Sequence, residues 1–209
     1  MAYGRSNFAR EEGLTDTVLQ NFDAWHRLLT QWNAKINLVS KSAAEHFWFR
    51  HALDSWQVSR HIPAGAQAIL DLGSGSGFPG LALAIAAKDQ QPTSQITLVE
   101  SAGKKASFLR TVIRELNLPA TVKSERAETM PPLPYNVISA RAFAPLPRLL
   151  TYAQPFWGEH TKAVLLKGQA LPEELTEAQK YWSFQSDISQ SRSDPQGEIV
   201  VITDLKKRE

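Results

Sequence analysis

The sequence contains no cysteine, which excludes disulfide bonds, thiolate metal ligands and a cysteine nucleophile. It has no long hydrophobic run either. The longest, Leu81–Ala87, is too short to span a bilayer, and residues 1–13 lack the apolar core of a signal peptide. The formal net charge is only +2, and no pair of histidines has a spacing typical of a metal site. We therefore expect a soluble, cytoplasmic protein with no metal and no membrane partner.

The 209 residues are 43% hydrophobic and 21% charged, which is typical of one folded domain of ordinary size. Apolar residues recur at helical spacing over residues 14–32, and a second helix is predicted over residues 43–60. Strand-like and helical segments alternate from residue 66 onward. The expected strands are 66–72, 94–101, 119–125, 135–142, 161–168 and 197–203, with a further strand near 182–189 to pair with the last one. The expected helices between them are 79–88, 103–117, one around 147–157, and 172–182.

This alternation predicts an α/β fold with a mostly parallel sheet and helices on both faces. We expect residues 1–62 to form an N-terminal helical cap and residues 63–209 to form the α/β core as one compact unit. Ligands of such sheets bind at the carboxyl ends of the strands, where the strand order reverses. The first strand of the core ends in the loop 71–80, DLGSGSGFPG, which therefore lies where a ligand is expected.

The spacing of the four glycines in this loop excludes two common sites. A phosphate-binding Walker A loop needs a lysine after its last glycine, and Leu81 stands there. A nucleophile elbow needs a serine midway between two glycines, and Gly75 stands there.

Two adenosyl cofactors remain. Gly75–Gly80 matches the dinucleotide fingerprint, with Glu100 twenty positions later to bind a ribose hydroxyl. The additional Gly73, just after Asp71, is instead typical of loops that wrap S-adenosylmethionine. We favour the methyl donor and keep the nicotinamide dinucleotide as the alternative.

Other candidate residues follow later strands. Arg141 ends the fourth strand and is expected to face the ligand crevice, although a surface salt bridge is the simpler interpretation. Ala127 and Glu128 follow the third strand, where an adenine edge would lie, or they belong to a solvated loop.

Basic residues gather on two predicted helices. On the first, Arg50 lies one helical turn from Asp54, either as an intrahelical salt bridge or as part of a functional polar face. On the second, Arg110 and Arg114 lie opposite the apolar face, which indicates either a solvated surface or a track for RNA phosphates.

Several stretches together resemble one family, the ribosomal small-subunit RNA methyltransferase G family, formerly called glucose-inhibited division protein B. They occur in family order over nearly the whole chain, and GFPG and RAFA are far more specific than a glycine pattern. The stretches are WNAKINLVS (32–40), RHALDS (50–55), DLGSGSGFPGLALAI (71–85), LVESAGKKASFLR (98–110), SARAFAPL (139–146), LLKG (165–168) and GEIVVI (197–202).

The resemblance implies a Rossmann-like S-adenosylmethionine-dependent methyltransferase with an N-terminal helical cap. It implies methylation of N7 of guanine 527, in the 530 loop of 16S ribosomal RNA. The expected partner is that RNA or the small ribosomal subunit, and the protein is expected to be a monomer. The predicted cofactor contacts are Asp71, Gly73, Ser74, Gly75, Gly77, Phe78, Glu100, Ala127, Glu128 and Arg141, of which Arg141 also positions the reactants. The predicted RNA contacts are Arg50, His51, Lys104, Arg110, Arg114 and Lys167.

This chemistry agrees with what the sequence lacks. Guanine N7 carries a lone pair and no proton, so its methylation needs positioning and no general base. Without cysteine a thiolate adduct on a pyrimidine is excluded. The alternatives are an NAD(P)-dependent oxidoreductase and a non-catalytic RNA-binding module.

Overall fold

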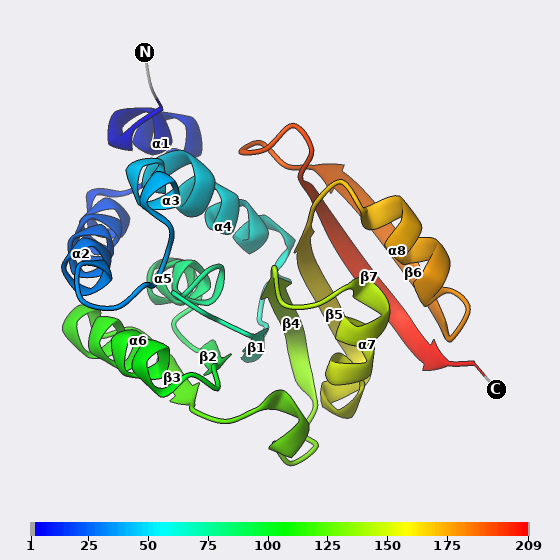
Figure 1. The fold of residues 1–209 in the computed structure, drawn as a ribbon. Helices are drawn as coiled ribbons and strands as arrows, with labels where there is room; N and C mark the ends of the chain where they lie inside the picture. Colours follow the sequence, from blue (N-terminus) through cyan, green and yellow to red (C-terminus); the bar gives the residue numbers. More distant parts are fainter. Residues whose placement is uncertain (1–2, 209) are drawn as a thin grey trace.

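The computed structural model describes residues 3–208, which contain one seven-stranded sheet with helices on both faces (Figure 1). The strands run in the order β3-β2-β1-β4-β5-β7-β6 across the sheet. Strands β1 to β5 are parallel, whereas β7 is antiparallel to β5 and β6 on its two sides. The strand bounds are β1 Ala68–Leu72, β2 Gln95–Val99, β3 Ala120–Lys123, β4 Tyr135–Arg141, β5 Trp157–Lys167, β6 Trp182–Gln190 and β7 Glu198–Lys207.

The strand order reverses between β1 and β4. The chain moves outward from β1 to β3 and then returns to place β4 on the other side of β1. The carboxyl ends of β1 and β4 therefore meet at the point where ligands bind in open α/β sheets. The glycine loop follows β1 there, and Arg141 ends β4 beside it.

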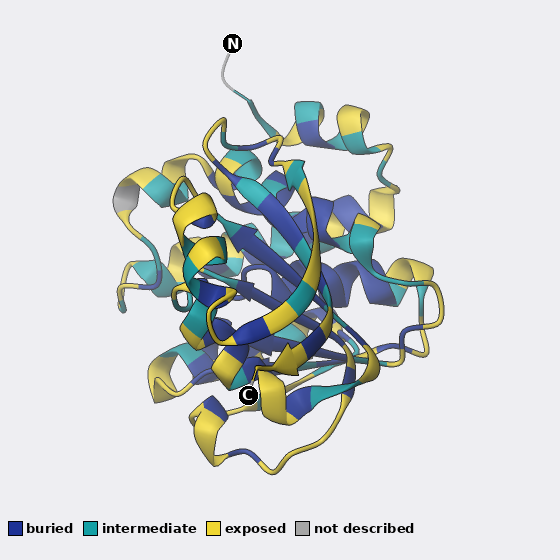
Figure 2. Cartoon of the chain, turned by 90° about the vertical axis from the view of Figure 1, so that its right-hand side faces the viewer, coloured by how far each residue is buried: buried dark blue, intermediate teal, exposed yellow. Residues whose placement is uncertain are grey.

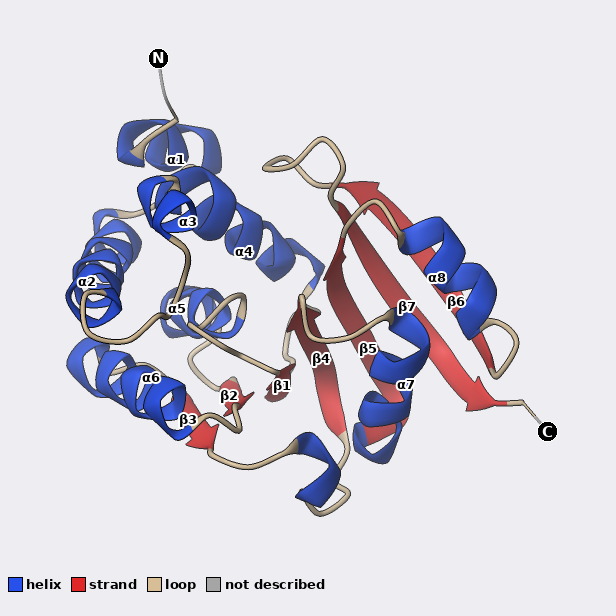
Figure 3. Ribbon diagram, in the orientation of Figure 1, coloured by secondary structure: helices blue, strands red, loops and turns tan. Residues whose placement is uncertain are grey.

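Two helical layers cover the sheet because alternate residues of a strand face opposite sides (Figure 3). On β5, Val164 packs in the cluster formed with the helices α2, α5 and α6, and Leu165 packs in the cluster formed with α7 and α8. Figure 2 shows the resulting pattern, with buried strands inside a mostly exposed outer layer. The helix bounds are α1 Arg5–Glu12, α2 Asp16–Asn33, α3 Lys41–Glu45, α4 Asp54–Trp56, α5 Gly80–Gln90, α6 Gly103–Leu116, α7 Leu146–Ala153 and α8 Leu171–Ala178.

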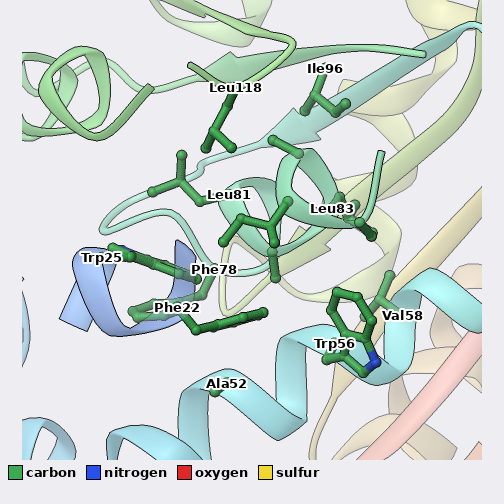
Figure 4. Packing of buried hydrophobic residues seen from close by; sticks show 14 of the residues in the cluster. Phe22, Trp25, Ala52, Trp56, Val58, Phe78, Leu81, Leu83, Ile96 and Leu118 are labelled. Atoms are coloured by element: carbon green, nitrogen blue, oxygen red, sulfur yellow. The ribbon is translucent and has the colours of Figure 1, made fainter. Parts of the chain in front are cut away.

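The N-terminal helices share a hydrophobic cluster with α5 and the glycine loop. Phe22 and Trp25 of α2 lie beside Phe78 and Leu81 (Figure 4). The ring centroids of Trp25 and Phe78 are 4.8 Å apart. This packing brings the N-terminal residues against the loop that follows β1. The division into a cap of residues 1–62 and a core of residues 63–209 stays a prediction.

The predicted helical segment over residues 43–60 is confirmed, but it is not one regular α-helix. The chain there forms α3, a π-helical segment at Phe47–Leu53, α4, and a 3₁₀ segment at Gln57–His61. Because a π-helical turn is wider than an α-helical one, four-residue spacing does not set the side-chain pairs. The carboxylate of Asp54 pairs with Arg141 of β4 and not with Arg50.

Most other predicted elements are confirmed with shifted ends, including the pairing of the last two strands. Helix α1 was not predicted. Strand β5 begins at Trp157, earlier than expected, and the predicted helix around 147–157 corresponds to α7 and the 3₁₀ turn Gln154–Phe156 that follows it.

Candidate functional site

The glycine loop between β1 and α5 approaches neighbouring side chains too closely for larger residues. Gly73 has a φ of +68°, and a Cβ there would lie 2.2 Å from Cδ2 of Phe143. Gly77 has a φ of +99°, and a Cβ there would lie 2.3 Å from Cδ1 of Leu81. Both positions therefore require glycine for conformation and for space. The loop is tied to β2, because the amide of Ser74 donates to the carbonyl of Val99 at 2.9 Å.

A cleft of about 560 Å³ opens above this loop at the carboxyl ends of β1, β2 and β4. Its volume is in the range of small-molecule and cofactor sites. The cleft brings together eight of the predicted cofactor contacts, which come from four separate parts of the chain. They are Gly73, Ser74, Gly75, Phe78, Glu100, Ala127, Glu128 and Arg141.

Glu100 lies just after β2 with its carboxylate against the glycine loop. Its Oε2 accepts a hydrogen bond from the amide of Gly75 at 2.9 Å, and its Oε1 accepts one from the amide of Ala102 at 2.7 Å. Ala102 is the residue directly before α6, so the second contact holds the entry to that helix, although no side-chain hydrogen bond caps the helix itself. Only 8% of Glu100 is exposed, and that part lines the cleft.

Asp71 and Gly77 are not among the residues that line the cleft, so their role as direct cofactor contacts stays a prediction. Asp71 is completely buried below the loop, where its Oδ1 accepts a hydrogen bond from Ser139 at 2.8 Å. Its Oδ2 lies 2.5 Å from where a Cβ on Gly80 would be. Burial raises the pKa of Asp71 to about 6, in spite of the hydrogen bond from Ser139. Asp71 supports the turn from below.

Arg141 lies at the end of β4 and is held by several partners at once. Its Nη1 donates to Oδ2 of Asp54 at 3.0 Å and to the carbonyl of Arg50 at 3.1 Å. Its Nη2 lies 3.1 Å from Nδ1 of His51, and the guanidinium stacks over Phe78 at 4.7 Å from the ring centroid. The interpretation of Arg141 as an exposed surface salt bridge is wrong, because its side chain is only 20% exposed.

His51 is buried, which corrects its prediction as an RNA contact. It is 7% exposed and stacks on Phe78, with ring centroids 4.3 Å apart. Burial is the main cause that lowers the pKa of His51 to about 3, and the nearby guanidinium groups add to it. The ring is therefore neutral at physiological pH, and its Nδ1 accepts the hydrogen bond from Arg141.

A second cleft of about 630 Å³ lies next to the first. The two clefts share the segment 141–145, which forms a wall between them. Lys167 lines the second cleft, where its Nζ pairs with Glu174 at 2.5 Å and donates to the carbonyl of Ala144 at 3.1 Å. The second cleft therefore has room for a ligand group on the other side of Arg141 from the glycine loop.

The remaining predicted RNA contacts lie on the surface outside both clefts. Arg50, Lys104, Arg110 and Arg114 are exposed, and Arg114 pairs with Glu115 at 3.0 Å. Lys104 borders a separate small cleft with Lys35 and Asn37. The structure thus separates these cations from Lys167, which the sequence had grouped with them.

The sequence-based prediction missed several residues of the first cleft. Leu38 and Val39, from the segment after α2, form part of its wall, and Ser76 of the glycine loop donates to the carbonyl of Leu38 at 2.7 Å. The ring of Phe143 lies against Gly73. Their only signal in the sequence was that they fall in the WNAKINLVS and SARAFAPL stretches. Further missed residues of the cleft are Lys105, Arg126, Arg148 and Tyr152.

Two general properties bear on the kind of site. Among residues 3–208, no group of three or more histidine and acidic side chains is placed to hold a metal ion. No helix in the described part of the chain is long and apolar enough to cross a membrane.

The strand order, the glycine loop and the acidic residue after β2 define the class of protein. The crystal structure of M. jannaschii TYW2 in complex with AdoMet matches this chain with a TM-score of 0.57 at 12% identity, covering 84% of this chain and 80% of that one. This similarity establishes a shared fold. The protein therefore has the Rossmann-like fold found in S-adenosylmethionine-dependent methyltransferases.

The family model described as GidB, rRNA small subunit methyltransferase G, matches residues 18–198. Two proteins named ribosomal RNA small subunit methyltransferase G are similar over nearly the full length. That of Hyphomonas neptunium is 39% identical, covering 98% of this chain and 96% of its own, and that of Gluconobacter oxydans is 46% identical, covering 86% and 90%. The chain belongs to the rRNA small subunit methyltransferase G family.

Family membership decides between the alternatives that the glycine spacing left open. The protein is an enzyme that methylates small-subunit ribosomal RNA, so the interpretations as a nicotinamide oxidoreductase and as a non-catalytic RNA-binding module are wrong.

Proposed function

We propose that this enzyme transfers the methyl group of S-adenosylmethionine to N7 of guanine 527, in the 530 loop of 16S ribosomal RNA. The observation that supports this best is the pair of clefts that share the wall 141–145. One cleft has the glycine loop and a carboxylate suited to an adenosyl group. The other offers room for a base that has left its stack, as bases in RNA loops readily do.

In this proposal the cofactor occupies the first cleft. The carboxylate of Glu100 binds the ribose hydroxyls, and Ala127 and Glu128 lie against the adenine. The backbone of Gly73, Ser74 and Gly75 surrounds the methionine part. The cleft residues fit the cofactor. The cleft volume is adequate, and a Cβ on Gly73 would occupy space where the loop comes closest to Phe143.

The chemical step requires little from the side chains. S-adenosylmethionine supplies a methyl carbon on a positively charged sulfur. The N7 lone pair forms the new carbon–nitrogen bond while the carbon–sulfur bond breaks toward sulfur, and the positive charge passes to the guanine ring. No proton leaves N7, so no general base is needed. The protein contributes by holding N7 roughly 3 Å from the methyl carbon and in line with the sulfur.

Arg141 and the surface cations take different parts in the proposal. Arg141, which lines both clefts, positions the reactants. Arg50, Lys104, Arg110 and Arg114 bind RNA phosphates, which orients the RNA without reading its sequence. Lys167 contacts the RNA within the second cleft. We propose that the enzyme acts as a monomer on the small subunit or on its naked RNA.

The test is a methyl-transfer assay with radiolabelled S-adenosylmethionine. Small subunits and naked 16S RNA from cells lacking the modification serve as the two substrates, which identifies the natural one. Reduction with borohydride and cleavage with aniline cut RNA at 7-methylguanosine. We expect one cut, at guanine 527. Label on another atom or another nucleotide would refute the proposed target, and no transfer to either substrate would refute the proposed reaction.

A further inference from the structure

The guanidinium of Arg141 is fixed by groups that lie far away in the sequence. Its one carboxylate partner among the described residues is Asp54, at 3.0 Å and 87 residues away along the chain. The two side chains are 20% and 14% exposed, so the pair is mostly shielded from water. Such a pair keeps its geometry better than a surface ion pair, because solvent screens it less.

Asp54 is in turn held by the segment that joins β6 and β7. Ser193 donates to Oδ1 of Asp54 at 2.6 Å, and Ser191 donates to the same oxygen at 3.3 Å. Gln57 donates to Oδ1 at 3.3 Å and to the hydroxyl of Ser191 at 2.9 Å. One carboxylate oxygen, Oδ1, thus accepts hydrogen bonds from the supporting segment. The other, Oδ2, accepts the hydrogen bond from Arg141.

The segment 191–197 is itself fastened to the N-terminal helices. The backbone amide of Arg192 donates to Oε1 of Gln57 at 3.1 Å, and its guanidinium pairs with Glu12 of α1. Glu12 also pairs with Arg60 at 2.6 Å. These contacts fix the serines and therefore fix Asp54.

The position of Asp54 separates its role from that of a direct contact to the cofactor. Asp54 lines the second cleft and does not line the first, whereas Arg141 lines both. Its negative charge also matters for the reaction. The sulfonium before the transfer and the methylated guanine after it each carry one positive charge, so an unpaired guanidinium beside them would repel the occupant of the site in both states. Asp54 balances that charge and sets the direction of the guanidinium.

We propose that Asp54 is a positioning residue for methyl transfer, which acts through Arg141 and is held in place by Ser191 and Ser193. This inference rests on the proposed function, because it concerns the same site. It makes the β6–β7 segment part of the support of the active site, although it is remote from the glycine loop in the sequence.

The test measures kcat with saturating RNA and cofactor, together with the Kd for S-adenosylhomocysteine by calorimetry. We expect Asp54→Asn to lower kcat about 10- to 100-fold, as expected when a reacting group is displaced by a fraction of an ångström to an ångström. We expect its Kd for S-adenosylhomocysteine to change less than about threefold, since Asp54 does not line the first cleft. Ser193→Ala, which keeps Asp54 but removes its shortest hydrogen bond, should lower kcat by a smaller factor.

A double-variant cycle separates positioning from general loss of structure. If Asp54 acts through Arg141, Asp54→Asn added to Arg141→Gln will lower kcat little further. Asp187→Asn makes the same charge change at an exposed site on β6 and should leave kcat unchanged. If Asp54→Asn does not fold, the same cycle is run with Ser193→Ala and Arg141→Gln.

Wild-type kcat in the Asp54→Asn variant, or in Ser193→Ala if that variant replaces it, would overturn the proposal. Additive losses in the double variant would also overturn it. The nucleotide that the wild-type enzyme methylates tests the proposed function separately. A product other than 7-methylguanosine 527 would refute that function, while the ratios of variant to wild-type rates would still test Asp54.

Discussion

The two sides of the first cleft are built in different ways. On the glycine-loop side, the contacts come mainly from backbone atoms within one short stretch, with Glu100 of the next strand closing the loop. On the Arg141 side, side-chain hydrogen bonds join Arg141 to Asp54 and Asp54 to Ser193, which are 87 and 139 residues apart in the chain. The first side is a local turn that glycine permits. The second is a network that exists only after the N-terminal helices, β4 and the β6–β7 segment have packed together.

The two sides also differ in what a substitution would remove. A side chain added to the glycine loop takes up space in the cleft, whereas a side chain removed from the Arg141 network leaves a buried charge without its partner. The comparison therefore predicts loss of cofactor binding on one side and loss of turnover on the other.

Gly73→Ala is expected to have the largest effect, because the added Cβ would overlap Phe143 and the positive φ is strained for alanine. We expect the Kd for S-adenosylhomocysteine to rise about 100-fold by calorimetry. Adding Phe143→Ala should restore part of the affinity by opening the space. Gly103→Ala is the control, since nothing lies within 4 Å of a Cβ there. Unchanged affinity in Gly73→Ala would contradict the close approach.

Glu100→Gln should weaken cofactor binding by about tenfold or more. The amide nitrogen of glutamine cannot accept a hydrogen bond, so one of the two bonds to backbone amides is broken, and hydrogen bonds to charged groups contribute about 1.5–3 kcal/mol. Calorimetry measures the affinity and thermal unfolding measures the stability. Glu115→Gln on the exposed face of α6 is the matched control. A wild-type Kd in Glu100→Gln would argue against its role at the ribose.

The two sides should respond to pH in opposite directions. The pKa of His51 is lowered from 6.5 to about 3 on folding, so its stabilising contribution is complete above pH 6.5 and is lost as the pH falls. Asp71 has a pKa raised from 3.8 to about 6, so the folded state binds the proton more tightly and gains stability as the pH falls through 6. Between pH 7 and 5 the loss from His51 is about 2 kcal/mol.

Urea unfolding of the wild type and two variants at pH 7 and pH 5 separates these contributions. His51→Gln should lose less stability than the wild type when the pH falls, because the group that must become charged is gone. Asp71→Asn should lose more, because the favourable protonation is gone. Identical pH dependence in all three proteins would mean that neither group is shifted in the folded state.

The smallest effects are expected outside both clefts. Arg110→Ala and Arg114→Ala should each weaken RNA binding a few-fold and reduce the slope of log affinity against log salt by about 0.7–0.9 for each phosphate that is no longer neutralised. Cofactor affinity should stay the same, because neither residue lines a cleft. Lys206→Ala, an exposed cation at the end of β7, is the control for non-specific charge. An unchanged salt dependence in both arginine variants would show that α6 is not part of the RNA-binding surface.

Much of the fold followed from short-range patterns. The alternation of strands and helices predicted the parallel sheet, and the glycine spacing located the loop at the end of β1. The segment 43–61 could not be predicted in the same way. Its π-helical and 3₁₀ turns depend on how Phe47, His51 and Trp56 pack under the glycine loop and α2, and periodicity alone cannot show that.

The residues of the candidate site likewise include some that the sequence predicted and some that it could not. Eight predicted cofactor contacts line one cleft because they follow the carboxyl ends of adjacent strands, and strand ends can be read from the sequence. His51 was grouped with the predicted RNA contacts, whereas tertiary packing buries its side chain. Leu38 and Val39 were missed because nothing in an irregular segment indicates which part of the sheet it will reach.

The sheet, the glycine loop and its acidic partner Glu100 could be predicted from the sequence, because each depends on residues close together in the chain or on the alternation of elements. The side chains that hold Arg141 are known only from the tertiary structure. It brought Asp54, Ser193 and β4 together across long loops, and it left His51 and Asp71 buried with shifted pKa values. The physical reason is that backbone turns are set by local conformation, whereas ion pairs and burial depend on contacts that form only when distant segments pack.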